Sequence, residues 1–333
     1  MSVPYDESVM TSTGITGAGG GRRPMLSAVL GASCISSSAI LVTLAHTGPV
    51  TTAFFRCALA LPVLVPLAIL ERRGLGRRPA RSRVIAGVAG LFLAVDLVLW
   101  NHAIADVGAG VATVLGNLQI LFVAAFAWLA LHERPQRRLV VMLPVVLTGV
   151  VLVSGMLGGG RGAGLHPAAG IVFGVATSAA YACFLIILRT AAGQSQHVAG
   201  QLADATAGAA VGSLAIGLVL GGLQFDVPWS ELRWLFALAV ISQSAGWLLI
   251  TSSLPRLPAA VSSLVLLLQP AGALLLADVV LRERPALVQV VGAALVCFGV
   301  VASTRASSAS TARPHDEPDQ DVRSPVEVTA NST

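Results

Sequence analysis

The feature that most constrains the fold is a series of apolar segments, each about as long as a membrane-spanning helix. A spanning helix needs roughly 20 apolar residues, because in lipid every backbone N–H and C=O must be satisfied within the protein. Only 11% of the residues are charged and 55% are hydrophobic, whereas soluble domains carry about 25% charged residues. The sequence therefore predicts an all-α membrane protein with ten transmembrane helices, near 25–45, 50–70, 84–104, 109–131, 139–157, 169–189, 199–222, 232–253, 259–281 and 286–304.

The arginines predict the orientation, since short loops rich in positive charge stay on the cytoplasmic side. With the amino terminus inside, most loop arginines face the cytoplasm, including the run between residues 72 and 83. Only Arg161, Arg233, Arg282 and Arg284 then face out. We therefore expect a multi-pass plasma-membrane protein with both termini in the cytoplasm. Because the basic residues lie in short loops beside apolar runs, nucleic acid is not an expected partner.

The chain also shows internal repetition when it is shifted against itself by 150 residues. Leu131–Pro135 then aligns with Leu281–Pro285, and Leu118–Gln119 aligns with Leu268–Gln269. Five helices per unit make the second unit enter the membrane from the opposite side, which is an inverted repeat. The predicted domains are a disordered cytoplasmic tail (1–24), repeat one (25–157), an external linker (158–168), repeat two (169–304) and a second disordered cytoplasmic tail (305–333).

Several stretches resemble EamA-type members of the drug/metabolite transporter superfamily. They are 109–135 with "VLGNLQ…LHERP", 246–285 with "LLLQP…LRERP", and "AFFRCALA" after Pro49. The resemblance implies two inverted five-helix EamA-like repeats around a central cavity, peripheral fifth and tenth helices, and efflux of metabolites or amino acids. The sequence departs from the family pattern where Ile120 follows Gln119, since Pro270 follows Gln269 in the other repeat. The proline that would kink the fourth helix is therefore missing.

Polar and bulky residues within the apolar segments are the candidates for substrate binding. Gln119 and Gln269 each lie about ten residues into a helix, so both are roughly 15 Å deep, near the bilayer centre. They are predicted either to line a cavity at the repeat interface or to join helices by hydrogen bonds. The other cavity candidates are Asn117, Trp100, Asn101, Gln243 and Trp247, and for each of the two tryptophans the alternative is lipid-facing packing.

Arg56 and Asp96 are the ionisable candidates, since a charge inside a membrane helix is costly unless it is paired or hydrated. By helix rise, Arg56 lies roughly 9 Å and Asp96 roughly 12 Å from the external end of its helix. One hypothesis is structural, either a fixed ion pair between the second and third helices or an arginine that snorkels outward. The other is that Arg56 captures a substrate carboxylate while Asp96 carries a coupling proton.

The remaining polar groups have structural interpretations. Glu133 with Pro135, and Glu283 with Pro285, are predicted to form turns that orient the following helices. Asp204 and Asp278 lie nearer helix ends, where a solvated vestibule is expected. The serines Ser36, Ser37 and Ser38 are interpreted mainly as close helix packing, and the cysteines as packing residues without metal-ligand spacing.

The leading functional hypothesis is a secondary transporter that exports small polar metabolites, such as amino acids, by alternating access. Its expected partners are the lipid bilayer and a small-molecule substrate, and no cofactor or metal is expected. Proton-coupled multidrug efflux is the alternative, although the first helix has no carboxylate and only Asp96 is available as a substitute. A non-transporting membrane scaffold is a third hypothesis. Since the sequence contains no catalytic constellation, an enzyme is not expected.

Overall fold

The computed structural model describes residues 22–131, 137–153, 166–192, 197–253, 269, 272–282 and 286–304. In these ranges the regular elements are all helical. The first half of the chain contains α1 (Arg22–Ser36), α2 (Ser38–Ala45), α3 (Pro49–Ala58), α4 (Leu61–Leu75), α5 (Ala80–Val107), α6 (Ala109–Gly116), α7 (Gln119–Leu131) and α8 (Arg137–Val153). The second half contains α9 (Pro167–Ala192), α10 (Val198–Leu220), α11 (Trp229–Ala237), the π-helix η2 (Leu238–Gly246), α12 (Trp247–Ser253), a helix over Gly272–Leu281 and α14 (Leu287–Thr304).

Six helical segments are long and apolar enough to cross a membrane. They are Pro24–Ala45, Pro49–Leu75, Ala80–Val107, Pro167–Ala191, Val198–Leu220 and Trp229–Ser253. Four shorter apolar helices, Ala109–Val123, Val140–Gly149, Gly272–Leu281 and Leu287–Gly299, coincide with the other expected crossings. The all-helical class is confirmed, and ten crossings stay a prediction.

Several spans consist of two helices separated by a short break. Ser37 separates α1 from α2, Leu59 and Ala60 separate α3 from α4, and residues 117–118 separate α6 from α7. The fourth segment is thus broken although Ile120 replaces the family proline. The backbone stays hydrogen-bonded through these breaks: the N–H of Ser37 donates to the carbonyl oxygen of Ser33 (3.2 Å), and the N–H of Leu118 donates to that of Leu115 (3.0 Å).

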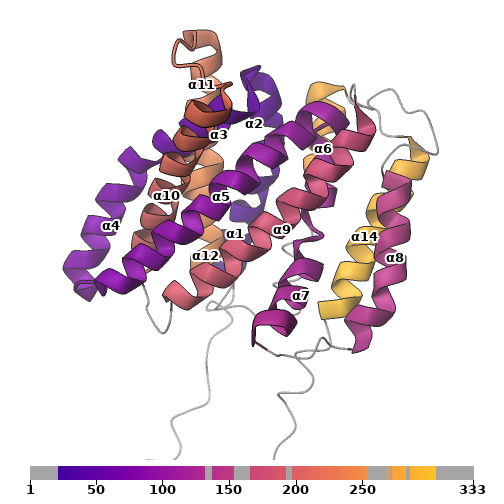
Figure 1. The fold of residues 1–333 in the computed structure, drawn as a ribbon, viewed down its shortest axis with the longest axis horizontal. Coiled ribbons are helices and arrows are strands. Elements are labelled where there is room, and N and C mark those ends of the chain that lie inside the picture. Colours follow the sequence, from indigo (N-terminus) through magenta and orange to yellow (C-terminus); the bar gives the residue numbers. More distant parts are fainter. Residues whose placement is uncertain are drawn as a thin grey trace, which may run out of the picture.

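The two halves of the chain pack against each other helix by helix. In the bundle, α5 lies along α9 and α10, α1 lies against η2 and α12, and α8 pairs with α14 at one edge (Figure 1). Small residues bring α5 and α10 very close together. A Cβ added at Gly90 would lie 2.0 Å from the carbonyl oxygen of Ala205, and one at Gly208 would lie 2.0 Å from that of Gly87. Since α8 and α14 contact mainly each other, this pair is peripheral, as the family resemblance implies.

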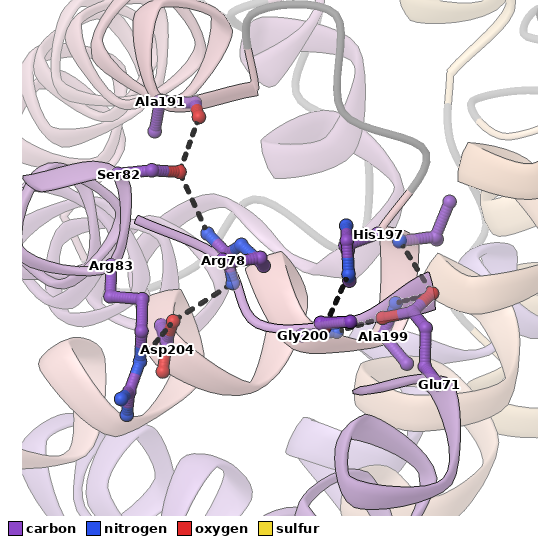
Figure 2. Close-up of polar contacts among 11 residues, drawn as sticks. Glu71, Arg78, Ser82, Arg83, Ala191, His197, Ala199, Gly200 and Asp204 are labelled. Carbon is purple, nitrogen blue, oxygen red and sulfur yellow. Dashed lines mark hydrogen bonds and ion pairs between the residues drawn. The ribbon is translucent and has the colours of Figure 1, made fainter. Parts of the chain in front are cut away.

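What we call the arginine-rich end of the bundle is defined by six arginines: Arg72 and Arg73 at the end of α4, Arg77 and Arg78 in the α4–α5 connection, and Arg81 and Arg83 at the start of α5. Here the two halves are joined by polar contacts (Figure 2). The carboxylate of Glu71 accepts hydrogen bonds from the backbone N–H groups of Val198 (2.7 Å), Ala199 (3.1 Å) and Gly200 (2.7 Å). These are the first N–H groups of α10, which have no partner within their own helix.

Arg78 adds an ion pair at the same end. Its Nη1 lies 2.8 Å from Oδ2 of Asp204, and its Nη2 donates to Ser82 (3.2 Å), whose hydroxyl donates to the carbonyl oxygen of Ala191 (2.6 Å). The Asp204 side chain is only 22% exposed, so it is less solvated than expected, whereas Asp278 is exposed as expected. We call the contacts of Glu71, Arg78 and Ser82 with α9 and α10 the inter-half clamp.

Candidate functional site

A polar cavity of about 120 Å³ lies inside the bundle, and both halves of the chain line it. The cavity lies beside the ends of α1 and α6, which contribute Ile35 and Gly116 to its lining. Two of the helix breaks, at Ser37 and at residues 117–118, are therefore next to the cavity. Most of the candidates from the sequence are among its lining residues. Those residues are Ile35, Arg56, Leu93, Asp96, Leu97, Trp100, Thr113, Gly116, Asn117, Gln119, Thr177, Tyr181, Trp247 and Gln269.

Arg56 enters the cavity from α3 and is held by uncharged oxygens. Its Nε donates to Oε1 of Gln243 at 2.8 Å, and its Nη1 donates to the Ser38 hydroxyl at 3.1 Å. A longer contact of 3.5 Å joins Nη2 to the Ser242 hydroxyl. Since a guanidinium has five N–H donors, these three bonds leave two for a ligand. Trp100 also lies 5.8 Å from the guanidinium carbon, measured to the ring centroid.

Gln243 belongs to the π-helix η2 and contacts Arg56 rather than lining the cavity itself. Its amide nitrogen donates to the hydroxyl of Thr206 on α10 (3.3 Å), so the amide joins α3, η2 and α10. π-Helical segments are rare in proteins, and they are found frequently at functional sites. Gln243 is fully buried, and its side-chain oxygen is the hydrogen-bond acceptor nearest to the Arg56 guanidinium, at 2.8 Å from Nε.

Asp96 faces the same cavity from α5, with its carboxylate bound by a hydroxyl. The Oγ1 of Thr177 on α9 lies 2.6 Å from Oδ1 of Asp96 and 2.7 Å from its backbone carbonyl oxygen. The predicted ion pair with Arg56 is absent from the described residues, where the ion pairs shorter than 4.0 Å are those of Asp204 with Arg78 and Arg83. The cavity therefore contains a cation and a carboxylate that do not neutralise each other by direct contact.

The break between α6 and α7 presents the amides of Asn117 and Gln119 to the cavity. The side-chain nitrogen of Asn117 donates to the carbonyl oxygen of Thr113 (2.8 Å). From α9, the Ser178 hydroxyl lies 2.8 Å from the carbonyl oxygen of Leu115 and 3.2 Å from that of Gly116. The Ser178 hydroxyl thus joins α9 to the end of α6, where the carbonyl oxygen of Leu115 also accepts from the backbone N–H of Leu118 (3.0 Å). Gln269 of the second half lines the same cavity.

The chain was compared with known protein families and with solved structures. The sequence profile of the EamA-like transporter family matches residues 22–155 and again residues 168–305. The chain belongs to the EamA-like transporter family. It is therefore a multi-pass membrane transporter of the drug/metabolite transporter superfamily, and the resemblance found in the sequence is confirmed.

A solved structure described only as a crystal structure of a protein is also similar to this EamA-like transporter. It is 18% identical in sequence, with a TM-score of 0.58, and the match covers 88% of this chain and 99% of the other. That likeness shows the fold alone. No curated protein matches the chain.

Not every candidate of this EamA-like transporter reaches the cavity. Asn101 is buried away from the lining, and its amide donates to the carbonyl oxygen of Pro49 (2.9 Å). The turn residues Glu133, Pro135, Glu283 and Pro285 lie outside the described residues. Within those ranges no group of three or more histidine, cysteine or acidic residues is placed to hold a metal ion.

Sequence reasoning missed five polar residues around the cavity of this EamA-like transporter. They are Ser38, Thr113, Thr177, Tyr181 and Ser242. Hydroxyl residues are common in transmembrane helices as packing groups, so their type alone did not mark them. For Ser38 the sequence did contain a signal, the run of three consecutive serines. Such a run gives little support to a helix interior, and the helix breaks at Ser37.

Proposed function

We propose that this EamA-like transporter moves small zwitterionic solutes, such as amino acids, by alternating access. The observation that carries the proposal is the cavity in which Arg56 and Asp96 both lie without pairing. Arg56 retains two N–H donors, the number that a bidentate carboxylate accepts. Asp96 supplies an acceptor for an ammonium group. A zwitterion satisfies both charges at once, whereas a simple anion leaves the carboxylate unmatched.

The size of the cavity favours a small solute over a bulky drug. Its volume of about 120 Å³ holds several waters but is below the ~300–1,000 Å³ typical of pockets for drug-sized ligands. The amides of Asn117, Gln119 and Gln269 provide further neutral hydrogen-bonding groups. Trp100 and Trp247 provide aromatic surface for the apolar part of the substrate.

For the architecture, we propose ten crossings in two inverted five-helix repeats, with both termini in the cytoplasm and export across the plasma membrane. The arginine-rich end would then be cytoplasmic, in line with the positive-inside rule. Cysteine labelling of Leu75 and Arg282 in a cysteine-free variant tests the topology, since these positions should react from opposite faces. Labelling of both from one face would exclude the inverted repeat.

A coupling proton is a second proposal, favoured by the position of Asp96 in the cavity. Multidrug efflux driven by protons is not favoured by the cavity size, and a membrane scaffold would need no unpaired charges inside the bundle. Transport by the Asp96→Asn variant separates these possibilities. If a proton is coupled, the variant should retain exchange of substrate, with the weaker affinity left by the loss of its ammonium acceptor, but should fail to accumulate it against a gradient.

The direct test is flux of labelled amino acids in proteoliposomes. Gln269→Ala and Gln119→Ala should each reduce uptake by about tenfold, the effect of one lost hydrogen bond of about 1.4 kcal/mol. Leu129→Ala is the matched control because Leu129 lies on α7 but is 68% exposed. Undiminished flux in both glutamine variants would remove these amides from the binding site. Absence of flux for every amino acid in the wild type would overturn the substrate class.

A further inference from the structure

A second cavity, of about 190 Å³, lies between α4 and α10 at the arginine-rich end, and the transport proposal does not use it. Four arginines and one carboxylate are among its lining residues: Arg72, Arg77, Arg78, Arg83 and Asp204. Its other wall is apolar and includes Val65, Ala68 and Ile69 of α4. Val65 and Ile69 are exposed large hydrophobic residues within a predicted membrane span. The cavity thus joins cationic groups to a lipid-facing surface.

The arginines of this cavity differ in how far they are already engaged. Arg78 is 5% exposed and bonds Asp204 and Ser82, while Nε of Arg83 lies 3.5 Å from the same Asp204 carboxylate. Asp204 is therefore shared by two cations. The side chains of Arg72 and Arg77 are exposed and make no hydrogen bond or ion pair with the part of the chain that the structure describes. They remain available to bind an anion.

An apolar groove of about 540 Å³ adjoins the basic cavity and shares Arg83 and Asp204 with it. This groove lies between α5 and α10, where the contact of Gly87 with Gly208 leaves no side chain to fill the surface. Its walls include Val84, Val88, Leu91 and Val211, all of them exposed. In a membrane span such a surface contacts acyl chains.

We propose that the basic cavity and the adjoining groove together bind one anionic phospholipid. Its headgroup phosphate lies among Arg72, Arg77 and Arg83, and an acyl chain lies in the α5–α10 groove. The position suits a lipid, because the spans Pro49–Leu75 and Ala80–Val107 end and begin at these arginines, the depth at which headgroups lie. A soluble phosphate would use the cations but gain nothing from the groove. Because Arg78 and Asp204 belong to the inter-half clamp, the lipid binds beside the joint between the two halves.

Native mass spectrometry of the full-length protein with phosphatidylglycerol and phosphatidylcholine tests the proposal. The wild type should retain phosphatidylglycerol in preference to phosphatidylcholine. The double variant Arg72→Gln/Arg77→Gln should bind phosphatidylglycerol roughly thirtyfold more weakly, given the contribution of each of two arginines near an anionic surface. Arg73→Gln/Arg81→Gln is the matched control, since both residues are exposed at the same end but do not line the cavity. An equal loss of phosphatidylglycerol binding in both double variants would overturn the site, because it would show that only the total positive charge of this end attracts the lipid.

Two further arms distinguish a lipid from a soluble phosphate. A hundredfold excess of glycerol 3-phosphate should not displace the phosphatidylglycerol, and displacement would reject the lipid in favour of a soluble anion. Val88→Trp, which fills the groove, should weaken phosphatidylglycerol binding, whereas Val95→Trp on the same helix should not. Val95 is also exposed but lies outside the groove. Unchanged binding in Val88→Trp would show that the groove holds no acyl chain.

Discussion

Gln243 accepts a 2.8 Å hydrogen bond from Nε of Arg56, a contact that joins residues 187 positions apart in the sequence. Both side chains are buried. Replacing Gln243 with Leu would leave a buried charged donor without its partner, at a cost of about 1–3 kcal/mol in the free energy of unfolding. We expect Gln243→Leu to lower thermal stability in detergent and to abolish transport.

Gln243→Glu separates stability from function at the same position. Its carboxylate would still accept from Arg56 and would form an ion pair, so stability should be largely retained. Transport should nevertheless fall, because the charge of Arg56 is then neutralised before a substrate carboxylate arrives. Normal transport by Gln243→Glu would mean that the charge of Arg56 is not used to bind substrate.

A second prediction concerns Asp96 and its partner Thr177, whose hydroxyl lies 2.6 Å from the Asp96 carboxylate. Thr177→Val removes the hydroxyl while keeping the shape, and should weaken amino-acid binding by several-fold, the effect of about 1 kcal/mol. The affinity for each ligand is measured from how strongly the unlabelled ligand inhibits the flux of a labelled amino acid. Asp96→Asn should weaken the binding of amino acids more than the binding of carboxylic acids that lack the amino group. An equal loss for both ligand classes would contradict an ammonium site at Asp96.

Most candidates from the sequence line one cavity, because the depth of a residue follows from its place along an apolar segment. Gln119 and Gln269 were placed near mid-depth by helix rise, and both line the same cavity. Depth says nothing about rotation around the helix axis. Asn101 is therefore buried elsewhere, and Arg56 is held by Gln243 instead of Asp96. The π-helix around Gln243 and the hydroxyl partners depend on packing between distant helices, which no local pattern encodes.

A third prediction tests the break in the fourth segment. Ile120 is the second residue of α7, within the first helical turn, where N–H groups have no intrahelical partner and proline is accepted. We expect Ile120→Pro to cost less than about 1 kcal/mol, whereas Phe126→Pro in the interior of α7 should cost about 3 kcal/mol or more. Thermal unfolding of both variants provides the comparison. Equal destabilisation would show that α7 does not begin anew after the break.

A fourth prediction addresses the inter-half clamp. Glu71→Gln removes the negative charge that binds three N–H groups of α10, so it should destabilise the arginine-rich end by roughly 1–3 kcal/mol. Hydrogen exchange of residues 197–204 should become faster, while exchange in the α8 and α14 pair should not change. Asp226→Asn is the control, since Asp226 is an exposed acidic residue in the α10–α11 connection. If Glu71→Gln exchanges as slowly as the wild type, the clamp contributes little to holding the halves together.

The last prediction concerns the close contact of α5 with α10, on which the cavity wall carrying Asp96 depends. A Cβ at Gly90 would lie 2.0 Å from the carbonyl oxygen of Ala205 and 2.8 Å from the backbone nitrogen of Ala209. Because backbone atoms cannot rotate away as a side chain would, Gly90→Ala must separate the helices and should cost at least about 1–3 kcal/mol. Gly74→Ala is the matched control, since a Cβ there meets nothing within 4 Å. In a helix this change should stabilise by up to about 1 kcal/mol. The unfolding temperature and the flux should therefore fall for Gly90→Ala but not for Gly74→Ala. A stable and active Gly90→Ala variant would contradict the close packing of these two helices.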